Sequence, residues 1–250
     1  MAKIRLRDLR KSFGPKVVLD GVDLDIEPGE SLVVIGGSGT GKSVLLKCLI
    51  GLLQPDSGRI LFQGQDLMRF HEEDFFAVRR HVAMVFQGSA LFDSLTVGEN
   101  VAYPLREHFP ELSPEEVARR VAEKLSWVDL PGTEGMMPAD LSGGMRKRVG
   151  LARAIATDPE VILWDEPTTG LDPLSTRTID ELIKSMRAKL HCTSIVVTHD
   201  MQSAFTVSDR IAMLANRKIV QVGSVPDMRA STVKEVRAFL DARKGEARMD

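Results

Sequence analysis

The order of hydrophobic and polar positions along the chain predicts strands that alternate with helices. Residues 3–9 (KIRLRDL) alternate, and 31–36 (SLVVIG) form a short apolar run ending in glycine, so residues 1–35 are expected to form strands. Further runs predict strands at 58–64 (GRILFQG), 81–87 (HVAMVFQ), 160–166 (EVILWDE) and 193–200 (TSIVVTHD). Strands that alternate with helices form a largely parallel sheet, so the predicted fold class is α/β.

The sequence predicts helices over about 42–53, over 113–130, from the loop at 142–145 to about 156, and over 175–190. The first is expected to stop at the turn cluster 54–58 (QPDSG). In the second, Ser113 is a candidate N-cap and Pro114 occupies the first turn. Residues 89–150 contain no comparable strands and begin with an irregular stretch, so they are expected to form a helical insertion.

Composition and charge narrow the function classes. A net charge of −2 gives no support to a nucleic-acid-binding surface. Cys48 and Cys192 lie far apart without metal-type spacing, which is typical of a reduced, cytosolic protein. No run approaches the ~18 apolar residues of a membrane span, and the start has no secretory pattern. The chain is therefore expected to be soluble by itself and to reach a membrane only through a partner.

Residues 36–43 (GGSGTGKS) match the pattern of a phosphate-binding loop between a strand and a helix. Backbone N–H groups of such a loop wrap phosphate oxygens, its lysine reaches the β- and γ-phosphates, and its serine hydroxyl binds Mg²⁺. A glycine-rich turn that arises by coincidence is the alternative, and the strand–helix context argues against it. The predicted nucleotide-binding residues are Gly36, Gly37, Ser38, Gly39, Thr40, Gly41, Lys42 and Ser43.

Polar residues stand where other predicted strands end, the edge at which open parallel sheets bind ligands. Asp165 is placed to hold Mg²⁺, and Glu166 beside it to orient or deprotonate an attacking water. His199 follows another strand and is expected to contact the γ-phosphate. An exposed acidic turn and a structural histidine are the alternatives. Gln87 also ends an apolar run, but a glutamine there means little by itself.

A second glycine motif, 141–150 (LSGGMRKRVG), opens a predicted helix and is also suited to an anion. Taken together, these motifs resemble the nucleotide-binding domain of an ATP-binding cassette (ABC) ATPase, over residues 3 to about 230. The resemblance identifies 36–43 as Walker A, Gln87 as the Q-loop, 161–166 as Walker B and 141–145 as the family signature. It implies a P-loop NTPase core with an antiparallel β subdomain and a helical subdomain.

The resemblance implies roles for single residues. Phe13 would stack on adenine, Asp172 would form the D-loop, and Gln87 would join Ser43 and Asp165 at Mg²⁺. Gln87, Glu166 and His199 are the expected catalytic residues. Met145 departs from the glutamine of many members but leaves the signature glycines intact.

The family also explains why one chain carries two phosphate-binding motifs. Two such domains pair head to tail, and the signature loop of one covers the ATP bound to the other. The residues expected to act across chains are Ser142, Gly143, Gly144 and Met145. The basic run 146–148 (RKR) is either a further phosphate contact or, as expected, a solvated helix face.

Three classes of function compete. One is a transporter motor docked on membrane subunits; another is a soluble ABC protein, with a cluster-assembly ATPase as the remaining candidate. The third is an unrelated P-loop kinase, in which the signature motif and His199 would have no role. Within transporters, residues 90–107 (ALFDSLTVGENVAYPLRE) with the signature region resemble ATPases of Mla/Mce-type phospholipid transporters. Another importer, for amino acids or small solutes, is the alternative.

That resemblance implies ATP and Mg²⁺, a second copy of the chain and integral permease subunits. It also implies an Mce-domain protein, a small accessory subunit, no nucleic acid, and a peripheral location on the cytoplasmic face of the bacterial inner membrane. The expected organisation is one ABC ATPase domain over 1–250, with a core and β subdomain at 1–88 and 151–230, a helical subdomain at 89–150 and a tail at 231–250. Apolar residues recur at helical spacing in the tail, which is expected to cover its own lobe or to contact a neighbour.

Overall fold

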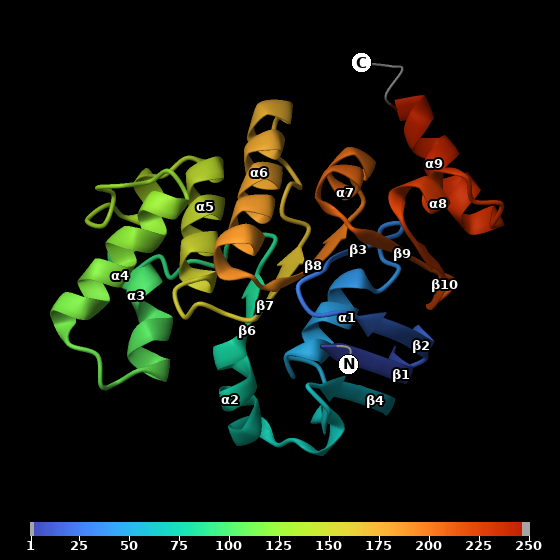
Figure 1. Ribbon diagram of the computed structural model, residues 1–250, viewed down its shortest axis with the longest axis horizontal. Helices are drawn as coiled ribbons and strands as arrows, with labels where there is room; N and C mark the ends of the chain where they lie inside the picture. Colours follow the sequence, from blue (N-terminus) through green and yellow to red (C-terminus); the bar gives the residue numbers. More distant parts are fainter. Residues whose placement is uncertain (1–2, 247–250) are drawn as a thin grey trace. The chain divides into compact units, whose positions relative to one another are not determined.

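The computed structural model describes residues 3–246 (Figure 1). It divides into two compact units. Unit 1 comprises Met1–Val78 and Thr193–Asp250, and unit 2 comprises Arg79–Cys192. Within the described residues, no helix is both long and apolar enough to cross a membrane. The units combine an antiparallel sheet, parallel strand pairs and a group of helices, so the predicted α/β class is confirmed. The subdomain boundaries given by the sequence stay a prediction.

Unit 1 contains an antiparallel sheet in the order β2-β1-β4-β5. Its strands are β1 (Ile4–Phe13), β2 (Lys16–Ile26), β4 (Ser57–Phe62) and β5 (Gln65–Asp66). Strand β1 alternates until Leu6, and the register then shifts before Leu9. Asp8 has a φ of 45° at this bulge, so Leu6 and Leu9 are both buried although they stand three positions apart.

A second group of strands in unit 1 has the order β10-β9-β3-β8. These strands are β3 (Ser31–Ile35), β8 (Thr193–Thr198), β9 (Arg210–Ala215) and β10 (Lys218–Gly223). Strand β3 runs parallel to both β8 and β9. Every residue of β3 and β8 is buried, which is why each strand contains an apolar run, LVVI in β3 and IVV in β8.

The helices of unit 1 are short. They are η1 (Leu67–Arg69), α1 (Lys42–Leu49), α7 (Met201–Val207), α8 (Val225–Arg229) and α9 (Lys234–Glu246). Helix α1 ends four residues before the predicted end at about 53. Gly51 has a φ of 69°, and the backbone N–H groups of Leu52 and Leu53 both donate to the carbonyl of Lys47. The last apolar residues of the run therefore form a C-terminal turn and not a further helical turn.

The predicted tail helix is α9, which belongs to unit 1. Val236 and Leu240 are buried in the single chain, and the Asn216 amide donates to the Glu235 carboxylate at 2.9 Å. Of the two expectations for the tail, the structure therefore supports a helix that covers its own unit. The predicted tail continues to 250, and its last four residues lie outside the described residues.

Helix α2 (Glu72–His81) spans the boundary between the units and was not predicted. Only Val78 among its residues is buried, so the segment has no apolar stripe to indicate a helix. The helix does have acidic residues in its first turn and basic residues in its last, which complement the helix dipole. This charge order was the signal available in the sequence.

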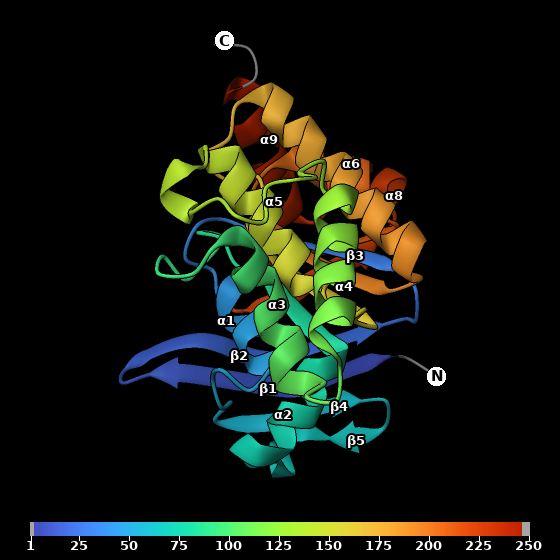
Figure 2. The same ribbon diagram turned by 90° about the vertical axis from the view of Figure 1, so that its left-hand side faces the viewer.

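Unit 2 contains a parallel strand pair, four further α-helices and one short 3-10 helix. They are β6 (Val82–Val85), β7 (Val161–Asp165), α3 (Val97–His108), α4 (Pro114–Trp127), η2 (Pro138–Asp140), α5 (Gly143–Ala154) and α6 (Pro173–Leu190). Helices α3, α4 and α5 contact one another, and Figure 2 shows them together. Helix α3 begins inside a stretch expected to be irregular, because Thr96 and Glu99 form a reciprocal capping box.

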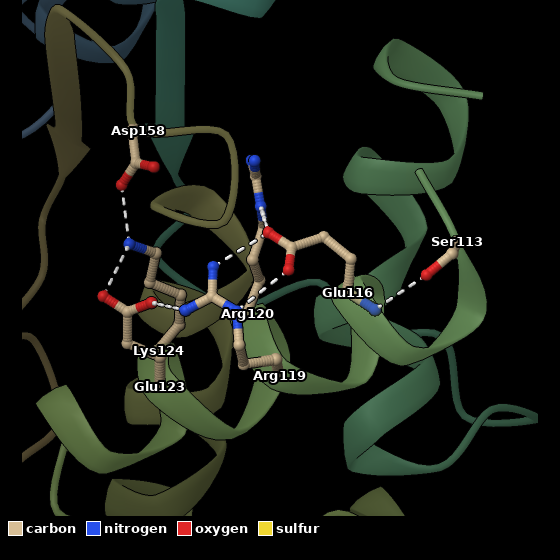
Figure 3. A network of polar contacts seen from close by, with 7 residues as sticks. All are labelled: Ser113, Glu116, Arg119, Arg120, Glu123, Lys124 and Asp158. Atoms are coloured by element: carbon tan, nitrogen blue, oxygen red, sulfur yellow. Dashed lines mark hydrogen bonds and ion pairs between the residues drawn. The ribbon is translucent and has the colours of Figure 1, made fainter. Parts of the chain in front are cut away.

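A network of polar contacts runs along α4 (Figure 3). The Glu116 carboxylate accepts hydrogen bonds from Arg119 and Arg120, and these guanidinium groups lower its pKa from an ordinary 4.5 to about 2. Any contribution of this exposed cluster to stability is therefore complete above pH 4.5 and is lost as the pH falls toward 2. Exposed pairs of this kind contribute little to folding.

Lys124 in the same helix has a different environment. Its side chain is 3% exposed. Its ammonium lies 2.6 Å from the Asp158 carboxylate and 3.7 Å from the centre of the Trp127 ring. Asp158 lies in the turn after α5, so this ion pair joins α4 to the segment that leads into β7 (Figure 3). Removing the partner of a buried ammonium lowers the free energy of unfolding more than removing the partner of an exposed one.

We predict that Asp158→Asn lowers the free energy of unfolding by about 1–2 kcal/mol. It removes the closer of the two carboxylates at the Lys124 ammonium and leaves Glu123 at 3.8 Å. Asparagine tolerates the φ of 52° at this position, so the backbone is not strained. Glu116→Gln is the matched control and should leave the thermal midpoint nearly unchanged. Equal shifts for the two variants in thermal unfolding would contradict this distinction.

Candidate nucleotide site

The predicted phosphate loop follows β3 directly and leads into α1. Gly36 lies so close to β9 that a Cβ atom on it would stand 2.4 Å from the backbone oxygen of Leu214. Gly41 has a φ of 106°, and a Cβ there would lie 2.8 Å from Val18. Both positions therefore require glycine, and the loop is fixed at its two ends.

Lys42 is the first residue of α1 and its side chain returns over the loop. The ammonium donates to the carbonyls of Gly36 at 2.9 Å and Gly37 at 3.2 Å. The residue is buried, whereas Ser38 and Gly39 at the top of the loop are exposed. This arrangement places a positive charge and a helix N-terminus at one loop, which suits a phosphate group.

An open hollow of about 330 Å³ lies beside the loop in unit 1. Its lining residues are Pro15, Lys16, Val17, Val18, Gly39, Thr40, Asn216 and Arg217. Phe13 ends strand β1 just before these residues, and its ring is 46% exposed. The Lys11 ammonium lies 5.3 Å from the ring centre. An exposed aromatic ring that precedes the lining of this hollow by two residues is available to stack on a base.

His199 reaches the same edge of the sheet as the loop. Strand β8 pairs in parallel with β3, and Thr198 is level with Ile35, so His199 and Gly36 follow at neighbouring strand ends. The Thr198 hydroxyl accepts a hydrogen bond from Asp200 N, and Asp200 caps α7. The structure thus places His199, half-buried, at the loop edge of unit 1; its predicted role in contacting phosphate stays a prediction.

In unit 2, a second pair of strands presents polar residues at its carboxyl edge. Trp164 is level with Val85, so Asp165 at the end of β7 lies beside the end of β6. Gln87 follows β6 by two residues and is exposed. Asp165 is buried, with its carboxylate at the end of a wholly buried strand. The pairing brings the two predicted metal ligands of unit 2 to one edge.

Glu166 follows Asp165 with a φ of 49°, an uncommon conformation for a residue with a side chain. The residue is 8% exposed. Its carboxylate accepts a hydrogen bond from the Thr169 hydroxyl at 3.1 Å, and its carbonyl accepts one from Thr169 N at 3.2 Å. A tight turn therefore fixes the predicted catalytic carboxylate, and Thr169 is a partner that the sequence analysis missed.

The signature residues open helix α5. Ser142 is its N-cap and accepts a hydrogen bond from Met145 N at 3.2 Å. Ser142 and Gly143 are exposed, and among the described residues no atom lies within 4 Å of a Cβ built on Gly143. Gly144 is the next residue and its Cβ would lie 4.0 Å from the Ser175 hydroxyl. The helix N-terminus thus faces open space with its first N–H groups available to an anion.

The expectation of a solvated basic face at 146–148 fits Arg146, which is exposed, but not Lys147 and Arg148, which are half-buried. Arg146 donates to the Leu141 carbonyl, Lys147 to the carbonyls of Pro167 and Thr169, and Arg148 to those of Val128 and Asp129. All three cations therefore hold backbone of their own unit. Helical spacing shows which residues share a face, but the carbonyls that they meet depend on tertiary packing.

Asp172, the predicted D-loop residue, is the N-cap of α6. It accepts hydrogen bonds from the backbone N–H groups of Leu174 and Ser175 at 3.0 Å, and from the Ser175 hydroxyl at 2.5 Å. The Ser175 hydroxyl, followed by these backbone groups, lowers the pKa of the Asp172 carboxyl. The residue is exposed, so its side chain lies at the surface of unit 2.

The predicted Mg²⁺ ligands are chemically suited to the ion. Ser43 in α1, Asp165 at the end of β7 and Gln87 after β6 supply a hydroxyl, a carboxylate and an amide oxygen. Hard divalent cations prefer such oxygen ligands, and a carboxylate buried at a strand end suits a doubly charged ion. Ser43 belongs to unit 1, and Asp165 and Gln87 belong to unit 2.

Similar proteins agree with the fold and the motifs. Residues 19–169 match the family described as ABC transporter. The chain is 43% identical over 241 residues to the probable ribonucleotide transport ATP-binding protein mkl of Mycobacterium leprae, covering 96% of this chain and 69% of that protein. It is 40% identical over 245 residues to the intermembrane phospholipid transport system ATP-binding protein MlaF of Haemophilus influenzae, covering 98% of this chain and 91% of MlaF.

Among solved structures, the chain resembles a dimeric post-hydrolysis state of the ATP-binding cassette MJ0796 bound to ADP and Pi. The TM-score is 0.82 at 31% identity, over 89% of this chain and 98% of that chain. With the phosphate loop, this likeness defines the class of the protein as an ATP-binding cassette ATPase. The chain belongs to the ABC transporter family. The predicted family and ATPase activity are confirmed, and the unrelated kinase is excluded.

We predict that Lys42→Ala weakens ATP binding at least about tenfold, because a charge-assisted contact to phosphate is lost. Lys47→Ala, in the same helix, is the matched control and should bind ATP as the unchanged protein does. Titration with a fluorescent ATP analogue measures both affinities, and circular dichroism verifies the fold. Equal affinities for the two variants would show that the Lys42 ammonium does not meet phosphate.

Proposed function

We propose that the chain is the ATP-hydrolysing subunit of a bacterial phospholipid transporter of the Mla/Mce type. The ATPase part is supported by the edge of unit 1, where a loop closed by Lys42 lies beside His199. The observation that carries the phospholipid part is the match to MlaF, which extends over 91% of that protein. The relatives named for ribonucleotide transport are slightly more identical, but this chain spans only 69% of the mkl protein of M. leprae.

The residues divide the chemistry of ATP hydrolysis among them. Phe13 stacks on adenine, the loop 36–43 binds the phosphates, and Lys42 neutralises negative charge on them. Glu166 orients and deprotonates the attacking water, with Gln87 and His199 facing the γ-phosphate. Ser43, Asp165 and Gln87 would hold Mg²⁺, which would supply further neutralisation of phosphate charge.

Two copies of the chain act together with ATP between them. Ser142, Gly143, Gly144 and Met145 of one copy cover the phosphates bound to the other copy. The open N-terminus of α5 supports this arrangement, since its exposed N–H groups have room for a partner's γ-phosphate. The exposed Asp172 accepts a hydrogen bond from the Ser175 hydroxyl, which lies 4.0 Å from a Cβ built on Gly144, and it belongs to the same interface. Hydrolysis removes the charge that holds the two copies together.

The segment after Gln87 is the expected contact with the permease. Phe92 and Tyr103 are 42% and 43% exposed, and their ring centres lie 4.9 Å apart. The buried Asn100 amide bonds the backbone of residues 92, 95 and 96, so the loop beneath this aromatic pair is stiff. Arg153 of α5 donates to the carbonyls of Ser89 and Ala90. A stiff surface with exposed aromatic rings suits a partner helix.

The permease spans the membrane and places this subunit on the cytoplasmic face of the bacterial inner membrane. An Mce-domain protein and a small accessory subunit complete the complex. The physical logic is that a cassette delivers a closing motion and does not itself select a lipid. Partner identity therefore determines cargo identity, and no nucleic acid is involved.

We predict that Lys42→Ala and Gly144→Asp chains complement each other. Each variant alone loses ATP-dependent dimers and turnover, because both sites of its dimer are defective. In a mixed dimer one site carries both defects and the other none. With equal amounts and random pairing, about half of the dimers are mixed, so about a quarter of all sites should be intact. Differently tagged chains allow both pairing and phosphate release to be measured. A mixture as inactive as its components would contradict the action of the signature loop across chains.

We predict that affinity purification from membranes recovers this chain with a multispanning permease, an Mce-domain protein and bound phospholipid. In liposomes the complex should move labelled phospholipid only with ATP, and Glu166→Gln should stop movement while ATP still binds. Recovery with a small-solute-binding protein, or ATP-driven ribonucleotide movement without lipid movement, would overturn the phospholipid proposal. The assignment of the chain as an ABC ATPase would stand in that case.

A further inference from the structure

Helix α5 makes a direct connection to the turn that holds Glu166. The helix begins with the signature residues Gly143 and Gly144, and Lys147 follows one turn later. The Lys147 ammonium donates to the carbonyl of Pro167 at 2.9 Å and to that of Thr169 at 2.6 Å. One cation of the signature helix thus bridges both ends of the short segment after Glu166.

The same segment is bonded to the Glu166 carboxylate. Thr169 donates its hydroxyl hydrogen to a Glu166 carboxylate oxygen at 3.1 Å and its backbone hydrogen to the Glu166 carbonyl at 3.2 Å. A continuous series of contacts therefore runs from α5 through Lys147 and Thr169 to the carboxylate. Because Glu166 has a φ of 49°, its backbone conformation depends on such surrounding contacts.

The surroundings of Lys147 indicate a defined contact and not a chance surface one. Burial lowers the pKa of Lys147, and the negative charge of Glu166 acts in the opposite direction. An ammonium that is partly withdrawn from water keeps its position only where acceptors are fixed, as these two carbonyls are. The next residue, Arg148, makes the same kind of contact with the carbonyls of Val128 and Asp129, away from Glu166.

We infer that Lys147 is a positioning residue for Glu166, and that it transmits the position of the signature helix to the catalytic carboxylate. The inference rests on the proposed role of Glu166 in hydrolysis. When a partner's phosphate meets Ser142 at the start of α5, Lys147 fixes the turn that aims the carboxylate at water. The consequence is that Lys147 affects the rate of hydrolysis and not the binding of ATP, since the phosphate loop is untouched.

The test compares Lys147→Met, Lys147→Arg and Arg148→Met in steady-state ATP hydrolysis. Methionine keeps the length but loses the donors, and misplacement of the carboxylate should lower kcat roughly ten- to a hundredfold with KM for ATP nearly unchanged. Arginine restores donors and should recover kcat to within about threefold of the unchanged protein. Arg148→Met removes an equivalent bond on the same helix and should leave kcat nearly unchanged.

Thr169→Val supplies a second route if Lys147→Met does not fold. It removes only the hydroxyl that bonds Glu166, and it should lower kcat without raising KM. Where both variants fold, their combined loss should be smaller than the product of the separate losses, because they interrupt the same series of contacts.

The outcomes separate this inference from the proposed function. Suppose that Glu166→Gln abolishes turnover. The positioning role is then wrong if Lys147→Met and Thr169→Val hydrolyse ATP normally. It is also wrong if Lys147→Met and Arg148→Met lose activity equally. If Glu166→Gln itself turns over normally, the proposed role of Glu166 fails first. A selective loss of kcat in Lys147→Met, rescued by Lys147→Arg, supports the inference.

Discussion

The contact between Gly36 and the backbone of Leu214 is the constraint on which the nucleotide half of the structure depends. Strand β3 is paired with β8 on one side and with β9 on the other, so the first residue after it is still held against the backbone of β9. Only a residue without a side chain fits there, since a Cβ would stand 2.4 Å from the Leu214 oxygen. The turn that follows is exposed at Ser38 and Gly39, and the Lys42 ammonium closes it through the Gly36 carbonyl. Phosphate binding is thus a consequence of how a buried strand ends.

The strands and the phosphate loop are predicted well from the sequence because the patterns that indicate them are local. Strands β3, β7 and β8 are buried along their whole length, so each contains an apolar run of three or more residues. The glycine pattern of the loop has few structural alternatives. Helix α2 escapes prediction because it buries almost none of its surface. The start of α3 falls in the stretch expected to be irregular, although Val97, Val101 and Leu105 recur at helical spacing and are buried, and a capping box precedes them.

For single polar residues, the sequence predicts positions at strand ends but not contacts with distant backbone, for a physical reason. A strand end determines where Asp165 and His199 lie, so their places follow from the pattern. The acceptors of Lys147 and Arg148 are carbonyls from distant turns, and no spacing in the sequence encodes such a meeting. The basic run after the signature glycines therefore looked solvated although it ties α5 to its own unit.

The central claim is that the signature loop of one chain covers the phosphate loop of another, and a cross-link tests it most directly. Ser38→Cys and Ser142→Cys are placed in separate, differently tagged chains that also carry Glu166→Gln; both sites are exposed. Burial of the native Cys48 and Cys192 raises their thiol pKa to about 12 and about 11, which keeps them unreactive. A short thiol cross-linker should give a covalent heterodimer only with ATP. Failure to form this heterodimer with ATP would contradict the account. A further chain that carries both cysteines should then cross-link only within itself.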